Sequence, residues 1–435
     1  MSFRSFIIRL AESGDLVTIT APISLQCEIS GVLKQLEPNA VLLEHVKESD
    51  FRIAGNIVPT KQAFAKYFGI DVSMIIPTLS HAIEERSTPQ ETSEAACQQV
   101  VIENPDLDQL PILRHFEDDG GRYITSGVVI AGHPEYGQNL DFHRCMQFSG
   151  TEMAVRVVKG RHFDAFLEDL GQVDVAVCIG CAPNVLAAAA TSVEMGVNEL
   201  EIANALEPLQ VVRAMNSDLL IPADAEFVLE GTVFRDRRHA EGHFVDLTET
   251  QDVVRQEPVF EIKTITHRRD AIWQALLPGS LEHKLLMGMP REPTIFKKVN
   301  QVVRCLDVNI NPGGASWLHA IVKIDKQSSD DGQKAIRAAF EGHSSCKHVF
   351  VVDKDIDIYN PLEVEWALAT RFQGDVDMVI KEKERGSSLD PSAELGSHLT
   401  TKIGFDLTRP LGEAGKPFEK VPYPQVDLRR FIAKS

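Results

Sequence analysis

The sequence predicts a mixed α/β protein made of three consecutive parts. The chain has 435 residues, too many for one ordinary hydrophobic core, so two or three domains are expected. Helical and strand patterns alternate in residues 1–95 and again in residues 299–435, whereas residues 96–298 are dominated by short strands. We therefore expect an N-terminal α/β unit, a β-rich central domain and a C-terminal α/β domain.

The N-terminal unit is expected to hold three helices and three strands. Apolar spacing predicts helices at 3–13, 28–36 and 60–68, and strands at 16–20, 40–46 and 51–58. The polar segment 84–94 marks a linker.

The central region shows the spacing of a barrel or a sandwich, because short runs of branched residues alternate with turns rich in Gly, Pro and Asp. Strands are predicted at 100–102, 124–130, 145–148, 154–158, 173–179, 209–212, 225–232 and 260–266, with helices at 184–190 and 199–206.

The last part returns to α/β alternation. Strands are predicted at 302–308, 318–324, 349–352 and 377–380, with helices at 328–342 and 360–371. The second helix has Asn360 at its N-cap and Pro361 at its first position, a strong start signal. The final forty residues look like a loop with four prolines, and a loop of this kind usually wraps a neighbour or closes a site.

Composition excludes several classes of protein. The net charge of −19 argues against non-specific nucleic-acid binding, and it means that a site for an acid must carry local positive charge. Seven widely spread cysteines fit a reduced cytoplasmic chain better than a disulfide framework. The N-terminal apolar run is cut by Arg9 and Glu12, which argues against a signal peptide. No stretch reaches the roughly 20 apolar residues that span a bilayer.

The segment from Gln138 to His162 concentrates groups that could hold a phosphate through a cation and steer a carboxylate. Asn139 and Arg144 are five residues apart, so in a regular strand they would lie on opposite faces and would need a bulge or turn to share a site. An Asn amide, the imidazole of His162 and the carboxylate of Glu199 suit Mn²⁺ or Mg²⁺ better than structural Zn²⁺. Taken singly, each residue also has a local explanation: a surface ion pair, a helix cap or a partner of the helix dipole.

Two further motifs have competing interpretations. Glu241 and Asp246 lie in a Gly-containing segment, and if both lined one pocket, repulsion would keep one protonated as a general acid. The alternative is a solvated loop with ion pairs. Cys178 and Cys181 form a lone CxxC, which we interpret as two small buried residues at a strand end. Phosphate-loop, GxGxxG, HExxH and GxSxG motifs are missing, which disfavours the corresponding enzyme classes.

Considered jointly, five motifs resemble the UbiD family of reversible decarboxylases. They are Gln138-Asn-Leu-x-x-x-Arg144, Lys159-Gly-Arg-His162, the long string Ser217 to Gly231, Glu241-Gly-x-Phe-x-Asp246 and Leu399 to Thr408. The resemblance implies a split β-barrel that binds prenylated FMN in residues 96–298 and a C-terminal oligomerisation domain. It also implies CO₂ removal from an aromatic, heteroaromatic or α,β-unsaturated acid, a flavin prenyltransferase that supplies the cofactor, and a homodimer or homohexamer.

The resemblance also assigns roles to residues. Asn139, His162 and Glu199 would bind Mn²⁺ (or Mg²⁺) beside the flavin phosphate, Lys402 would approach that phosphate, and main-chain oxygens of 189–191 would hold K⁺. Arg144, Glu241 and Asp246 would be the catalytic set, in which Arg144 orients the carboxylate and Glu241 delivers the proton. Asp246 stands where some members have Glu, which shortens its reach.

Substrate choice is expected to depend on His143, which would line the pocket, and on His283 and Arg291. In a helix the spacing of the last two leaves them about 80° apart, so both could face one cavity. By resemblance to UbiD-like enzymes that act on furan dicarboxylates, the pair favours a heteroaromatic or aromatic acid with a second polar group. The alternative is an interdomain helix in which both groups are solvated. The alternative functions are a flavin-binding or carrier protein of the same fold, and, less strongly supported, an FMN reductase.

Overall fold

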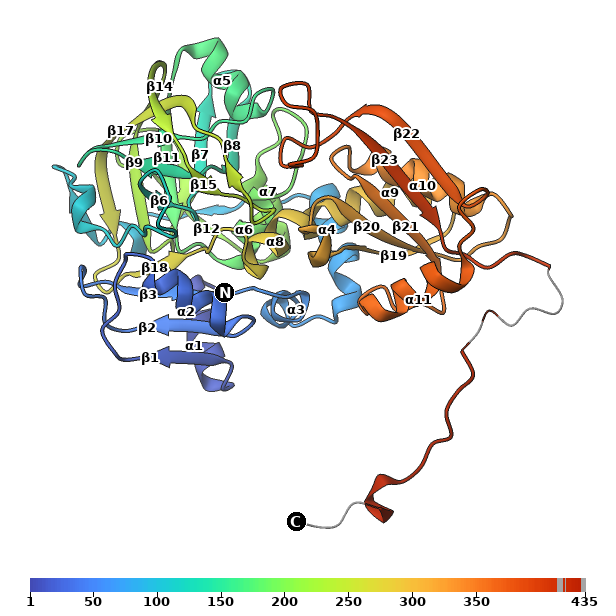
Figure 1. The fold of residues 1–435 in the computed structure, drawn as a ribbon. Helices are drawn as coiled ribbons and strands as arrows, with labels where there is room; N and C mark the ends of the chain where they lie inside the picture. The colour runs from blue at the N-terminus through green and yellow to red at the C-terminus, as the bar shows by residue number, and fades with distance from the viewer. Residues whose placement is uncertain (413–417, 419, 432–435) are drawn as a thin grey trace.

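We describe a computed structural model of the chain that covers residues 1–412, 418 and 420–431. Figure 1 shows a blue N-terminal unit beneath a teal-to-yellow central domain, and an orange-to-red C-terminal domain beside them. This confirms the predicted mixed α/β architecture. No helix among the described residues is long and apolar enough to cross a membrane.

The N-terminal unit is a four-stranded sheet whose order is β1-β2-β3-β18. Its strands are β1 (Leu16–Ile19), β2 (Ala40–Leu43), β3 (Arg52–Gly55) and β18 (Ile272–Ala275), and its helices are α1 (Phe3–Glu12), α2 (Glu28–Leu36), α3 (Lys61–Phe68) and α4 (Ile75–Glu84). Strand β18 comes from far along the chain, so the sheet ties the central domain to the N-terminal unit. Helix α4 was not predicted, and the expected linker begins only at its end.

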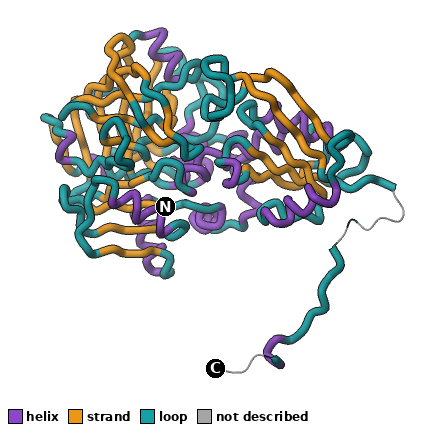
Figure 2. Tube along the Cα trace, viewed as in Figure 1, coloured by secondary structure: helices purple, strands orange, loops and turns teal. Residues whose placement is uncertain are grey.

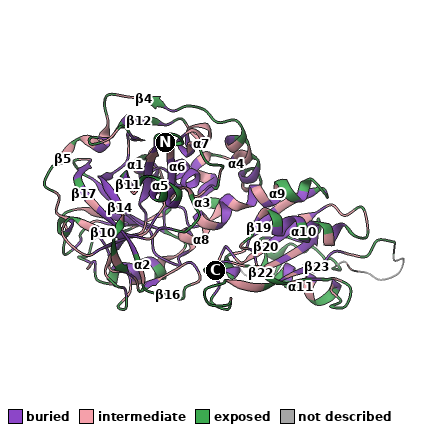
Figure 3. Ribbon diagram, turned by 90° about the horizontal axis from the view of Figure 1, so that it is seen from above, coloured by how far each residue is buried: buried purple, intermediate pink, exposed green. Residues whose placement is uncertain are grey.

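The central domain is one nine-stranded antiparallel sheet, ordered β6-β9-β10-β17-β14-β11-β7-β8, with β5 paired to β17. The strands are β5 (Val100–Ile102), β6 (Arg122–Ile124), β7 (Val128–His133), β8 (Gly137–Phe142), β9 (Cys145–Gln147), β10 (Glu152–Val155), β11 (Gln172–Ile179), β14 (Phe227–Glu241) and β17 (Arg255–His267). Helices α5 (His162–Leu170), α6 (Pro183–Ala189) and α7 (Glu199–Leu206) and the short strands β4 (Gln90–Glu91), β12 (Gln210–Arg213), β13 (Leu220–Pro222), β15 (Phe244–Val245) and β16 (Gln251–Asp252) complete it. Figure 3 colours the strands of this sheet by burial, with buried residues in purple.

Strands β8 and β9 lie near opposite ends of that sheet, yet only His143 and Arg144 separate them in sequence. A link this short spans roughly 10 Å between its flanking Cα atoms, so the sheet must curve until its two ends meet. The curved sheet is therefore an incompletely closed barrel. We call the place where β8 meets β9 the seam, and Arg144 lies on it.

The C-terminal domain is a five-stranded sheet ordered β19-β20-β21-β23-β22. Its strands are β19 (Cys305–Ile310), β20 (His319–Ile324), β21 (His348–Asp353), β22 (Met378–Arg385) and β23 (Leu399–Asp406), and its helices are α8 (Leu281–Gly288), α9 (Glu292–Asn300), α10 (Asp331–Gly342) and α11 (Pro361–Arg371). Figure 2 shows its strands as a separate orange group, apart from the strands of the N-terminal and central sheets.

Strand β23 corrects the prediction that the last forty residues form a loop. It pairs with β21 on one side and β22 on the other. Its buried positions are Lys402, Gly404 and Asp406, so the strand lacks an apolar stripe. A Cβ at Gly404 would lie 2.1 Å from Ile336 of α10, which explains why a small residue is needed there. The described segment 420–431 is exposed and runs away from the body (Figures 1 and 2).

Candidate active site

Arg144 and Glu241 form the centre of a buried polar network. Arg144 Nε donates to Glu241 Oε1 at 2.8 Å, and Nη2 donates to Oε2 at 3.0 Å, a two-point ion pair. Glu241 ends β14 and is fully buried. Burial alone would lower the pKa of Arg144, but the hydrogen bonds and charge of Glu241 raise it above its ordinary value. Arg144 therefore stays charged at neutral pH.

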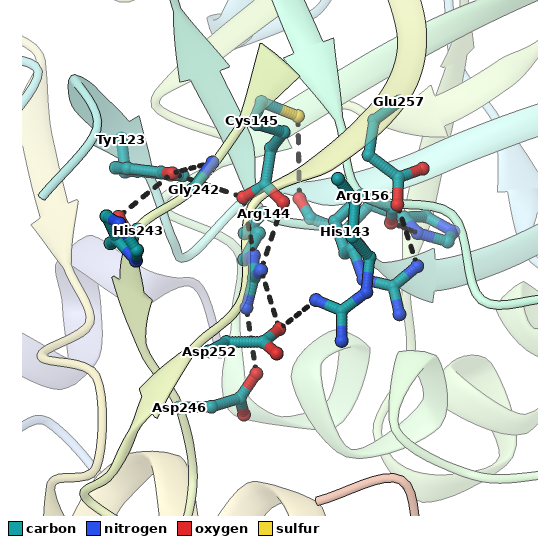
Figure 4. A network of polar contacts seen from close by, with 12 residues as sticks. Tyr123, His143, Arg144, Cys145, Arg156, Gly242, His243, Asp246, Asp252 and Glu257 are labelled. Carbon is teal, nitrogen blue, oxygen red and sulfur yellow. Dashed lines mark hydrogen bonds and ion pairs between the residues drawn. The ribbon is translucent and has the colours of Figure 1, made fainter. Parts of the chain in front are cut away.

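Two more carboxylates reach the same guanidinium. Asp246 Oδ2 lies 2.8 Å from Nη1, and Asp252 Oδ2 lies 2.9 Å from Nη2. Figure 4 shows Arg144 directed at both of them. Asp252 also accepts from Arg255 Nη1 at 2.5 Å, and although burial opposes it, the two arginines lower its pKa. Three acids thus share two guanidinium groups.

Tyr123 also belongs to this network, through Glu241. Its hydroxyl donates to Glu241 Oε1 at 3.1 Å and accepts from the Gly242 N–H at 3.1 Å. Burial, and after it the charge of Glu241, raises the pKa of Tyr123, so the phenol stays protonated. Glu241 therefore has three donors on its two oxygens.

His143 faces the other side of the seam. Its Nδ1 lies 2.8 Å from the carbonyl oxygen of Arg156, and its Nε2 lies 2.7 Å from Asp141 Oδ1. Burial lowers the pKa of His143, but Asp141 outweighs it and raises the pKa. Because both ring nitrogens are engaged, this side chain fixes the seam rather than offering a free group to a ligand.

The expected metal ligands do come together. His162 Nδ1 lies 2.9 Å from Asn139 Oδ1, and Glu199 Oε2 accepts from the Leu140 N–H at 2.8 Å. Helix α7 begins at Glu199, as predicted, α5 begins at His162, and strand β8 carries Asn139. The candidate metal set consists of the Asn139 amide, the His162 imidazole and the Glu199 carboxylate. Within the described residues, no group of three His, Cys, Asp or Glu side chains could hold a metal ion.

Two features of this set fit a bound cation with an anion beside it. The buried Asn139 Nδ2 is a donor without a hydrogen-bond partner, which suits an anion, and burial raises the pKa of Glu199 to about 8 despite the Leu140 N–H. A buried acid without a cationic partner is costly, and a hard divalent ion would remove that cost.

Lys402 lies on β23, not in a loop. It is buried, its Nζ donates to the carbonyl oxygen of Ser344, and burial lowers its pKa. Among the described residues Lys402 forms no hydrogen bond or ion pair with Asn139, His162 or Glu199, so its approach to a flavin phosphate stays a prediction. The main-chain oxygens of 189–191 as a K⁺ site also stay a prediction.

The helix that was expected to carry His283 and Arg291 is interrupted. Helix α8 ends at Gly288, and a 3₁₀ turn, η4 (Met289–Arg291), follows with Pro290 inside it. Pro290 cannot donate the next helical hydrogen bond, so the predicted regular helix does not hold and its 80° spacing does not apply. The pocket role of His283 and Arg291 stays a prediction. His283 Nδ1 accepts from the Gly279 N–H at 3.0 Å, and burial lowers its pKa against the charge of Asp246. Arg291 instead lies over Trp317, 5.4 Å from the ring centre.

Sequence reasoning missed Tyr123, Asp252 and Arg255. Each reaches the network from a different strand or turn, and none belongs to a motif with Arg144. The one available signal was the Asp252-x-x-Arg255 spacing, which is common in surface ion pairs. Cys178 and Cys181 are both buried at the end of β11, as predicted.

Three family models match nearly the whole chain. They describe the N-terminal, Rift-related and C-terminal domains of 3-octaprenyl-4-hydroxybenzoate carboxy-lyase, and they match residues 7–83, 89–281 and 284–407. Anhydromevalonate phosphate decarboxylase of Methanothermobacter thermautotrophicus is 39% identical over 96% of this chain and 99% of its own length. The protein of that name from Methanocaldococcus jannaschii is 38% identical, over 91% and 94%.

Solved structures agree with these family matches. The UbiD-class enzyme HmfF from Pelotomaculum thermopropionicum, in complex with FMN, superposes with a TM-score of 0.96 at 32% identity, covering 99% of this chain and 100% of that one. An evolved dimeric form of HmfF, in complex with prFMN, gives 0.91 at 31% identity with the same coverage. On the three domain models, the curated relatives and these superpositions, the chain belongs to the UbiD family of carboxy-lyases.

Proposed function

We propose that this protein uses prenylated FMN to decarboxylate an α,β-unsaturated acid that carries a phosphate group, as in anhydromevalonate phosphate. The observation that supports decarboxylation most directly is the two-point ion pair of Arg144 and Glu241, flanked by Asp246 and Asp252. Similarity to relatives with that name along almost the whole chain supports the substrate. It favours the unsaturated class over the heteroaromatic class that the sequence suggested.

The metal set provides the cofactor anchor. Asn139, His162 and Glu199 would hold Mn²⁺ or Mg²⁺ against the flavin phosphate, with Lys402 and a K⁺ near 189–191 completing the anchor. When bound, prenylated FMN supplies the electron sink that loss of CO₂ from an sp² carbon requires. A flavin prenyltransferase would provide it.

Arg144 holds the substrate carboxylate. A guanidinium has five N–H groups, and four of those of Arg144 are engaged by the three acids, which leaves one on Nη1. A carboxylate that binds in a two-point manner must therefore displace an acid. Asp246 is the acid most easily displaced, because it contacts Nη1 and its side chain is the most exposed of the three, at 21%.

Glu241 delivers the proton that replaces CO₂. In the absence of substrate it is held as a carboxylate by Arg144 and Tyr123. When the substrate draws Arg144 away, Glu241 loses a cationic partner, and a buried carboxyl in that position favours its neutral form. Glu241 takes up a proton from solvent and passes it to the carbon that lost CO₂, which leaves Glu241 a carboxylate again, and Tyr123 keeps that group in place.

The assembly and the compartment are part of the proposal. We expect a homodimer or homohexamer, in line with the dimeric form described for the HmfF relative. All seven cysteines are free thiols and six are buried, which suits a reducing cytoplasm.

The test is a CO₂-release assay on protein co-expressed with a flavin prenyltransferase. Anhydromevalonate phosphate, furoate, pyrrole-carboxylate, indole-carboxylate and cinnamate are compared at equal concentration, and the cofactor is followed by absorbance. Turnover of the phosphorylated acid above the other four supports the proposal. Flavin binding without CO₂ release from any acid would favour the flavin-carrier alternative, which needs the phosphate anchor but no acid set.

A further inference from the structure

The hairpin of β15 and β16 supplies three of the groups that touch Arg144. Phe244 and Asp252 face each other across its two strands, and Asp246 follows β15. The ring centre of Phe244 lies 4.4 Å from the Arg144 guanidinium carbon, while Asp246 and Asp252 accept from its nitrogens (Figure 4). We call residues 242–254 the clamp, because they hold Arg144 both by its face and by its edge.

The loop at the tip of the clamp has a costly residue in its last position. The Asp246 N–H donates to the Thr250 carbonyl oxygen at 3.1 Å, and the Glu249 N–H donates to the Asp246 carbonyl oxygen at 2.8 Å. This is the pattern of a three-residue hairpin loop, in which the last loop residue has a positive φ and is usually glycine. Here Glu249 adopts a φ of +61°. Strain of this kind is a reason to ask what the side chain does.

The carboxylate of Glu249 joins the clamp to two other parts of the chain. Its Oε1 lies 3.0 Å from Lys284 Nζ on α8 and 3.3 Å from Lys34 Nζ on α2. Lys34 also pairs with Glu37 at 3.0 Å, and Glu37 accepts from the Leu281 N–H at the start of α8 at 2.8 Å. Burial raises the pKa of Glu249, but Lys284 and Lys34 outweigh it and lower the pKa. Four charges thus form a network, which holds better than an isolated surface pair.

The tip of the clamp is also closely packed. A Cβ at Gly279 would lie 2.9 Å from Glu249 Cγ and 3.4 Å from the Asp246 carbonyl oxygen, and Leu247 between those two residues is fully buried. Asp246 and Glu249 close the same tight turn, so the place where Glu249 is anchored fixes the direction from which Asp246 approaches Arg144.

We propose that Glu249 is a positioning residue that acts through Asp246. By tying the tip of the clamp to Lys284 and Lys34, it keeps Asp246 against Nη1 of Arg144 and so sets how firmly the substrate carboxylate is opposed when it takes that place. The inference rests on the proposed function, since it concerns the acid that the substrate displaces. Glu249 itself need not touch the substrate.

The test uses E249Q, which removes the charge, and K284Q, which removes the closer cationic partner. E249G removes the charge and suits the positive φ, so it serves if E249Q does not fold. The matched control is E84Q, because Glu84 forms a comparable ion pair, with Lys297 at 2.8 Å, and its side chain is 57% exposed against 51% for Glu249. The KM and kcat of each loaded protein are measured for the phosphorylated acid, and E249Q is also combined with D246N.

We expect E249Q, E249G and K284Q to lower KM about 2- to 5-fold, the range of one charge pair of this kind. The kcat should stay within about twofold, because Asp246 is already displaced when the substrate is bound. In the D246N background E249Q should change nothing further, and E84Q should match wild type. At about 1 M salt the network is screened, so the difference in KM between wild type and E249Q should vanish.

An unchanged or higher KM in both Glu249 variants would overturn the inference, because a merely structural loss does not tighten substrate binding. The same fall in KM with and without Asp246 would overturn it as well, because Glu249 would then act by another route.

Calorimetry with 3-methylbutanoate, a saturated carboxylate, separates this inference from the proposed function. If wild type does not decarboxylate the phosphorylated acid, yet E249Q tightens binding of 3-methylbutanoate about 2- to 5-fold and D246N cancels that gain, the positioning role stands and the substrate assignment fails. If wild type turns the acid over and E249Q changes neither KM nor the binding of 3-methylbutanoate, the assignment stands and the positioning role fails.

Discussion

The carboxylate of Glu241 meets the side of the Arg144 guanidinium, with Nε and Nη2 each donating to a separate oxygen. Arg144 comes from the seam between β8 and β9, and Glu241 from the last position of β14, 97 residues later. This arrangement leaves Nη1 directed at Asp246. The proposed proton donor and the group proposed to orient the carboxylate thus form one coupled pair, so changing either should change the state of the other.

Replacing Glu241 by Gln should abolish turnover while leaving the cofactor bound. Gln keeps the shape but has no proton to give, and general acid catalysis typically contributes about 10²- to 10⁴-fold. The measurement is kcat for CO₂ release together with the flavin spectrum. The control is Asp246→Asn, which should be milder because Asp246 acts through Arg144. Near wild-type kcat in the Glu241 variant would remove its role as proton donor.

Asp252→Asn should lower KM and kcat together. Removing this charge lets Arg144 attract the substrate carboxylate more strongly, but it frees Arg144 from the bridge to Arg255 and so loosens its geometry. Each effect should be about 2- to 10-fold, the worth of one hydrogen bond. Steady-state kinetics at two salt concentrations will measure both KM and kcat. A rise in KM would mean that Asp252 does not compete with the substrate for Arg144.

His162→Ala should leave the protein with little bound metal and little flavin. The imidazole is one of three proposed ligands, and the flavin phosphate would be held through the same ion. Metal analysis and flavin absorbance of the purified variant provide the measurement, and His45→Ala is the control because His45 is exposed and lies outside the proposed metal set. Full Mn²⁺ occupancy in His162→Ala would exclude His162 from the site.

Glu282→Gln should make the stability of the protein less dependent on pH. Glu282 is fully buried, accepts from the N–H groups of Ile57 and Val58 at 3.0 and 2.9 Å, and burial raises its pKa to about 7 from an ordinary value of 4.5. Because the folded state binds this proton more tightly, the free energy of unfolding falls as pH rises from 4.5 through 7, by about 3 kcal/mol in total.

The amide of Gln keeps the accepting oxygen and does not titrate, so the wild type should lose stability relative to Glu282→Gln between pH 5 and pH 8. Thermal unfolding at both pH values checks this, with the exposed Glu341→Gln as control. A difference in Tm between the two proteins that stays constant with pH would mean that Glu282 keeps an ordinary pKa in the folded state.

The sequence by itself determined the local features of this protein. Helix α11 begins at Pro361 behind its Asn360 cap, and α7 begins at Glu199 behind its Asn198 cap, because caps and apolar spacing act over a few residues. The motifs named Asn139, His162, Glu199, Arg144, Glu241 and Asp246, and the structure brings them together in two neighbouring groups. Interactions between residues close in sequence, together with the family motifs, were sufficient to predict these helix starts and candidate site residues.

Only the tertiary structure decided which distant groups meet. Asp252 and Tyr123 reach Arg144 and Glu241 because the curved sheet and the β15–β16 hairpin bring four separate segments to one point. Strand β23 escaped prediction because its buried face carries Lys402, Gly404 and Asp406, which are accepted there only because Ser344, Ile336 and Thr408 complement them. Contacts between segments that are far apart in sequence leave no periodic signal, so burial, charge pairing and close packing fix them only once the chain has folded.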